Sequence, residues 1–117
     1  MKNKIEQLVS AWKDTCQTDK FSENVVRNIA ANCISLAETW FDRHKPKDKE
    51  SFFITLFNKD GIGVEDLFGV TKENLPFTMV KILTGSSDKY SKIEVKSFIN
   101  GIEGIKDAEV IGDIEIS

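Results

Sequence analysis

Apolar residues in the first part of the chain recur at three- and four-residue spacing, which is the period of an amphipathic helix. One such stripe runs over residues 3–17 and consists of Ile5, Leu8, Val9 and Trp12. A second runs from Ser22 to the residues before Pro46 and consists of Val26, Ile29, Cys33, Leu36 and Trp40. We therefore predict two helices, and the short segment between them indicates an antiparallel helix hairpin.

The second predicted helix also carries residues that are typical of helix ends. Ser22 is a good N-cap because its side-chain oxygen can accept a backbone N–H of the first turn, and Phe21 can pack on Val26 one turn later. Basic residues occupy positions 43–45, where they suit the negative end of the helix dipole. Pro46 then ends the helix, because proline cannot continue it.

After residue 50 the apolar positions change to short runs of aromatic and β-branched residues between turn residues, a pattern typical of β-strands. The predicted strands cover residues 51–57, 75–84, 91–99 and 108–117. Between the first two, the helical spacing of Val64, Leu67 and Phe68 predicts a single helical turn.

The last two predicted strands rest on different evidence. Residues 91–99 alternate as a strand does but also fit a capped helix, and the Asn100–Gly101 pair that follows favours a hairpin. Residues 108–117 alternate as well, and we expect a kink at Gly112.

These elements predict one α+β domain over residues 1–117, a length that suits a single domain. Its helical part covers residues 1–45 and its mainly β part residues 51–117. We expect the helix hairpin to pack on a mainly antiparallel sheet of four to five strands.

The first predicted strand is apolar on both faces, which a sheet covered by one layer of helices does not require. Phe52, Ile54 and Leu56 point to one face, and Phe53 and Phe57 point to the other. The second predicted strand has the same property. The second face of the sheet therefore needs a partner chain, a curled sheet or a ligand cavity to cover it, unless one of these segments is a buried helix.

Charge is distributed unevenly along the chain. The net charge is -3, but residues 101–117 alone contain one lysine and five acids, for a charge of -4. The five acids are Glu103, Asp107, Glu109, Asp113 and Glu115. An acidic balance argues against nucleic acid as the partner, and we interpret the basic residues at 43–49 as a solvated linker.

We predict no catalytic, cofactor or metal site. The single histidine, His44, lies in a charged stretch, and we expect it to be solvated at a helix end. Cys16 and Cys33 do not have the spacing of a metal site and are expected to be free thiols. The first residues do not resemble a signal peptide, so we expect a cytoplasmic protein without a membrane segment.

The leading hypothesis is a small non-enzymatic protein-binding module that presents the five C-terminal acids to another protein, one with a basic surface. Inhibitors and immunity or antitoxin-type proteins that block basic nucleases are classes with this size and charge. One alternative is an NTF2-like cone that binds a small apolar molecule in a pocket lined by Trp12, Trp40, Phe53 and Met79. Another is a homodimer joined through the second face of the sheet.

Overall fold

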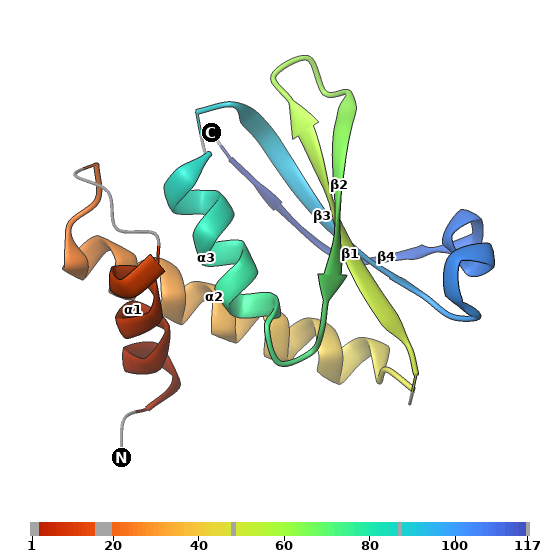
Figure 1. Cartoon of the computed structure of the whole chain (residues 1–117), viewed down its shortest axis with the longest axis horizontal. Coiled ribbons are helices and arrows are strands. Elements are labelled where there is room, and N and C mark those ends of the chain that lie inside the picture. Colours follow the sequence, from red (N-terminus) through yellow and green to blue (C-terminus); the bar gives the residue numbers. More distant parts are fainter. Residues whose placement is uncertain (1–2, 16–19, 48, 87, 117) are drawn as a thin grey trace.

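The computed structural model describes residues 3–15, 20–47, 49–86 and 88–116 (Figure 1). Its elements, in chain order, are α1 (Lys4–Thr15), α2 (Glu23–His44), β1 (Ser51–Asn58), β2 (Gly63–Val70), α3 (Leu75–Gly85), β3 (Tyr90–Phe98), the short 3-10 helix η1 (Gly101–Asp107) and β4 (Glu109–Glu115). The strands form one antiparallel sheet in the order β2-β1-β3-β4. The predicted α+β fold is confirmed, with helices first and an antiparallel sheet after them.

Helix α2 begins and ends where its capping residues predict. The Ser22 side chain accepts a hydrogen bond from the N–H of Val25 at 3.3 Å, which satisfies a donor of the first turn. At the other end Lys45 adopts a left-handed conformation with φ 52°, and its N–H donates to the carbonyl of Phe41 at 2.8 Å. Helix α1 ends at Thr15, and the remainder of the helix predicted there lies outside the described residues.

The strand predicted over residues 75–84 is wrong, because this segment is helix α3. Its buried residues spread over a wide part of the helix surface and do not form a narrow stripe. The apolar residues therefore do not recur with the clear three- and four-residue spacing that would distinguish a helix from a buried strand. The local signal lies at its start, where Asn74 occupies the N-cap position and Pro76 falls in the first turn. The structure therefore corresponds to the alternative in which one of the doubly apolar segments is a buried helix.

The helical turn predicted around residues 64–68 is also wrong, because these residues belong to strand β2. Leu67 lies opposite Ile54 of β1, but the register between the two strands shifts twice. Each bulge adds a residue to one strand and breaks the alternation of period two. The spacing of apolar residues in β2 therefore resembles that of a helix.

The strand predicted over residues 91–99 is confirmed as β3, and the C-terminal strand as β4. Asn100 and Gly101 both have positive φ angles, 66° and 65°, as a hairpin turn of this sequence requires. The chain then continues through η1 instead of returning at once, so β3 and β4 pair across a longer connection.

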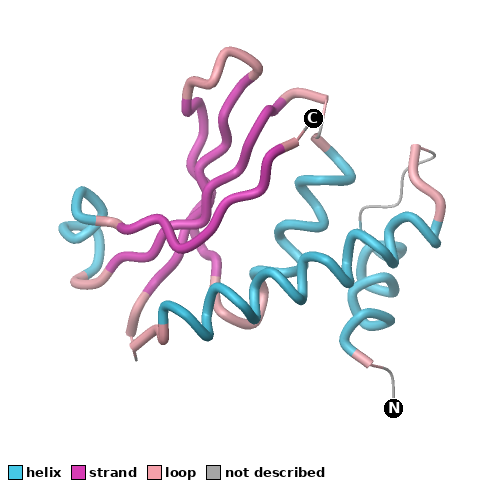
Figure 2. Tube along the Cα trace, turned by 180° about the vertical axis from the view of Figure 1, so that it is seen from behind, coloured by secondary structure: helices cyan, strands magenta, loops and turns pink. Residues whose placement is uncertain are grey.

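The core lies between the helices and one face of the sheet. Helices α2 and α3 lie against this inner face, and α1 packs on both of them, farther from the strands in both views (Figures 1 and 2). The indole N–H of Trp12 in α1 donates to the hydroxyl of Thr84 in α3 at 3.1 Å, and both residues are buried. This hydrogen bond satisfies the polar atom of a large buried side chain and ties the outermost helix to α3.

Gly112 lets α2 approach the edge strand β4. A Cβ atom at this position would overlap the ring of Trp40, which is 4% exposed. The kink expected at Gly112 coincides with a register shift between β3 and β4, because Val95 lies opposite Gly112 whereas Lys96 lies opposite Val110. The absence of a side chain at Gly112 is therefore a packing requirement of the helix–sheet interface.

We expect Gly112→Ala to lower the free energy of unfolding by about 1–3 kcal/mol, because the added methyl group overpacks the Trp40 site. Urea unfolding followed by circular dichroism measures this change. The matched control is Gly85→Ala, where a Cβ atom would meet no atom within 4 Å. The control should change stability by less than about 0.5 kcal/mol, and equal losses in both variants would contradict the role of Trp40.

Candidate functional site

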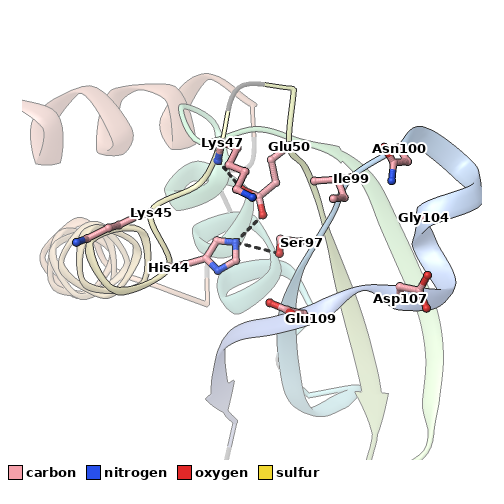
Figure 3. A pocket seen from close by; sticks show the side chains of 10 residues that line it. All are labelled: His44, Lys45, Lys47, Glu50, Ser97, Ile99, Asn100, Gly104, Asp107 and Glu109. Carbon is pink, nitrogen blue, oxygen red and sulfur yellow. Dashed lines mark hydrogen bonds and ion pairs between the residues drawn. The ribbon is translucent and has the colours of Figure 1, made fainter.

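A pocket of about 300 Å³ lies where the end of α2, the start of β1, the end of β3 and η1 meet (Figure 3). His44 and Glu50 form one wall, and Ser97 lies between them and β4. Asp107 and Glu109 line the pocket from the η1–β4 segment. The pocket therefore joins the basic end of α2 to the acidic C-terminal segment.

His44 is held by two polar partners. Its Nε2 atom lies 2.5 Å from Oε1 of Glu50 and 3.2 Å from Oγ of Ser97. The other carboxylate oxygen of Glu50 accepts the N–H of Lys47 at 2.8 Å. The side chains of His44 and Glu50 are 21% and 7% exposed, so the prediction of a solvated histidine is wrong.

Local backbone geometry brings this cluster together. Lys45 turns the chain out of α2 in the left-handed conformation, so Glu50 returns toward the helix end that carries His44. Ser97 comes from β3, where it lies opposite Phe52 of β1 and is 3% exposed. The three side chains, which we call the His44 clasp (His44, Glu50 and Ser97), connect the end of α2 to β3 and to the residue just before β1.

The clasp stabilises the charged form of Glu50. Burial alone would raise the pKa of this carboxyl group, but the hydrogen bonds from His44, the Lys47 N–H and Ser97 lower it by more. The pKa of Glu50 therefore lies below its ordinary value of 4.5.

The residue types of the clasp are those of a hydrolase triad, but their geometry is different. In a triad the carboxylate and the hydroxyl contact opposite ring nitrogens, so that histidine can accept the hydroxyl proton on one and donate from the other. Here Glu50 and Ser97 both approach Nε2 of His44. A proton on Nε2 that is donated to Glu50 leaves no lone pair there for Ser97, so the arrangement suits a structural role.

The structure divides the five predicted acids into two groups. Glu103 and Asp107 lie on η1, and Glu109 begins β4. Asp113 and Glu115 lie farther along β4, opposite Glu94 and Lys92 on the outer face of the sheet. Three of the predicted acids therefore gather around η1, and two lie toward the other end of the strand.

All five acids are exposed, and none forms an ion pair with another described residue. Elsewhere in the described chain some acids form ion pairs with lysine or arginine (Glu6, Glu23, Glu38, Asp88 and Glu94), whereas others, such as Asp60 and Glu73, form none. No ion pair among the described residues therefore involves the acids of the C-terminal segment.

Part of the second face of β1 is covered by the chain itself. Phe53 points away from the helices, yet it is only 3% exposed. The ring of Phe68 stacks on it with centroids 5.0 Å apart, and the ring of Phe98 meets it edge-on at 5.7 Å. Sequence reasoning found the two-faced strand but missed these covering rings, because their position depends on the register of β2 and β3.

The pocket predicted from Trp12, Trp40, Phe53 and Met79 does not form as one cavity. Trp12, Trp40 and Met79 belong to the inner core, whereas Phe53 lies on the outer face. The sheet separates them, so these four side chains do not share a wall.

Other site chemistry is sparse in the part of the chain that the structure describes. No group of three or more histidine, cysteine, aspartate or glutamate side chains there is arranged to hold a metal ion. Cys33 is a free, buried thiol, and burial raises its pKa to about 12. Cys16 lies outside the described residues.

Among the same residues, no helix has both the length and the apolar character that crossing a membrane requires. Comparisons with models of protein families, with curated proteins and with solved structures find no match for this chain. The interpretation of the site therefore depends on its own geometry.

We expect Glu50→Gln to lower the free energy of unfolding by about 1–3 kcal/mol near neutral pH, because it removes a charged acceptor from the His44 clasp. The pKa of Glu50 is lowered by folding, so its contribution is present above 4.5 and is lost as pH falls through the folded value. Urea unfolding at about pH 7 and about pH 3.5 should therefore show a smaller difference between wild type and variant at the lower pH.

The matched control is Glu38→Gln. Glu38 pairs with Lys4 at 3.3 Å, but both side chains are mostly exposed, so this ion pair contributes little stability. A loss at Glu50 that is the same at both pH values would contradict the assigned role of its charge.

Proposed function

We propose that this protein is a non-enzymatic protein-binding module that acts on a partner with a basic surface through η1 and β4. An inhibitor of a basic enzyme, such as an immunity or antitoxin-type protein, is the class that this proposal favours. The observation that carries it is that all five C-terminal acids are exposed and that none forms an ion pair with another described residue.

The position of these acids supports steering of a partner. Segment η1 extends from the end of the sheet, away from the helices, and none of its residues is buried (Figures 1 and 2). Charges that project from the body in this way extend a field of one sign into solvent, which raises the association rate of an oppositely charged protein. Such steering weakens as salt screens the charges.

We expect the triple variant Glu103→Lys, Asp107→Lys and Glu109→Lys to lose binding to the natural partner. Capture from the native host with wild-type and variant baits, followed by mass spectrometry, identifies basic proteins that only the wild type retains. For a purified partner, the association rate should fall by about 10-fold or more at low salt, and by less at about 0.3 M salt.

The control bait carries the same change in net charge at exposed positions outside the C-terminal segment: Asp14→Lys, Asp60→Lys and Glu73→Lys. It should retain the partner. If both baits behave alike, net charge alone governs the interaction and the proposed surface is wrong.

A second candidate function, the binding of a small apolar molecule, is supported by a different feature. A groove of about 720 Å³ lies between α1, α2 and the start of α3, and Leu8, Phe41 and Pro76 line it. The ion pair between Lys4 and Glu38 lies at its rim. This volume lies within the range of small-molecule sites.

If this groove binds apolar ligands, the dye 1-anilinonaphthalene-8-sulfonate should bind to the folded protein, and Leu8→Lys should reduce its fluorescence several-fold. Val25→Lys is the control, because Val25 is an exposed apolar residue of α2 that does not line the groove. An equal effect of the two substitutions would argue against the groove.

A further inference from the structure

The apolar side chains at the η1 end of the sheet are unusually exposed. Among the described residues, seven large hydrophobic side chains are strongly exposed, and four of them lie at this end: Phe68, Ile99, Ile102 and Val110. The other three lie on α2 or in the β1–β2 hairpin. Single exposed apolar residues are ordinary, but a group of them marks a surface that another molecule covers.

The register of the strands explains how this group forms. Phe98 ends β3 and lies opposite Ser51, and Val110 of β4 lies opposite Lys96 on the same outer face as Phe53. Phe68 stacks on Phe53 from the other side. Segment η1 connects Phe98 to Val110, so its Ile102, which is 86% exposed, extends the group beyond the sheet.

We propose that the side chains of Phe68, Phe98, Ile102 and Val110, here called the end patch, form the docking centre for a basic partner protein. Phe98 is half-buried, and the other three side chains are exposed. This inference rests on the proposed function and adds to it the apolar anchors of the interface. Side chains of this kind provide most of the binding energy at the centre of protein interfaces, whereas charges at the rim determine rate and specificity.

The charges around the end patch determine which partner fits. Glu103, Asp107 and Glu109 lie on or beside η1 and form no ion pair among the described residues, and they outnumber the single lysine of η1, Lys106. Asp107 and Glu109 also line the pocket beside His44. On the outer face Lys96 lies opposite Val110, and its Nζ atom lies 3.9 Å from Glu94 and above the ring of Phe53. The partner that complements this rim therefore carries lysine or arginine around an apolar recess.

A second copy of the chain fits this surface poorly. A twofold interface sets each patch against itself, and it would bring the three acids near η1 toward the same three acids of the partner copy. Like charges opposed in this way cost free energy and reduce association. The same charges disfavour nucleic acid, because its phosphates need a positive surface.

The test uses nuclear magnetic resonance titrations of the full chain with three synthetic peptides of about 14 residues. One contains leucine and lysine, one leucine and glutamate, and one serine and lysine. We expect the leucine–lysine peptide to shift the amide signals of residues 98–110 and of β2 near Phe68. The leucine–glutamate peptide should not bind there, and the serine–lysine peptide should bind at least about 10-fold more weakly, because it lacks apolar anchors.

Ile102→Ser should weaken binding of the leucine–lysine peptide by about fivefold or more. Because Ile102 is almost fully exposed, this substitution leaves the core intact. Ile62→Ser is the matched control, since Ile62 is 60% exposed in the β1–β2 hairpin, outside the end patch. This control should bind the peptide as the wild type does.

Three results would overturn the inference. One is peptide binding that shifts the amide signals of residues in the groove between α1 and α2 and leaves those of the end patch unchanged. Another is that the wild type and Ile102→Ser bind the leucine–lysine peptide with equal affinity while the triple lysine variant loses binding. The acids would then bind the partner as proposed, but the apolar side chains would contribute nothing. The third is a dimer in light scattering that Ile102→Ser converts to a monomer, because the occupant would then be a second copy. A different result would show that the proposed function itself is wrong: the triple lysine variant would still bind its natural partner.

Discussion

Strand β1 must bury side chains on both faces although helices cover only one of them. Helices α2 and α3 cover the inner face and enclose Ile54 in the core. On the outer face the neighbouring strands supply aromatic rings, and Phe68 and Phe98 cover Phe53. This solution transfers the exposed apolar area from the central strand to its neighbours, since Phe68 remains 54% exposed. The end patch is thus a consequence of how the sheet protects its centre.

The features that sequence reasoning predicted correctly are those with local causes. Ser22 and the left-handed residue before Pro46 define the ends of α2 within a few positions of the chain. Helix α3 was not predictable in the same way, because neighbouring elements enclose it and leave its apolar run without a period. Strand β2 was not predicted because its two bulges break the alternation of apolar residues. A bulge is defined only by the pairing of β2 with β1, which the sequence does not show.

The candidate surface shows the same division between local and distant causes. The excess of acids at the C-terminal end could be read from composition, and their exposure follows from their charge. Their separation into a group near η1 and a pair with Asp113 depends on the path of β4 across the sheet. The His44 clasp depends on contacts with Glu50 and with Ser97 of a distant strand, so a single histidine in a charged stretch gave no sign of it.

The contact of Trp40 with Gly112 also bears on how the molecule assembles. These residues are far apart in the sequence, and bringing them together requires a long loop to close. Strand β4 carries Glu109 and Val110, so the proposed docking surface is complete only when this strand is packed against α2 and β3. A partner that requires this surface would therefore bind the folded chain and not the unfolded one, and binding would draw the folding equilibrium toward the native state.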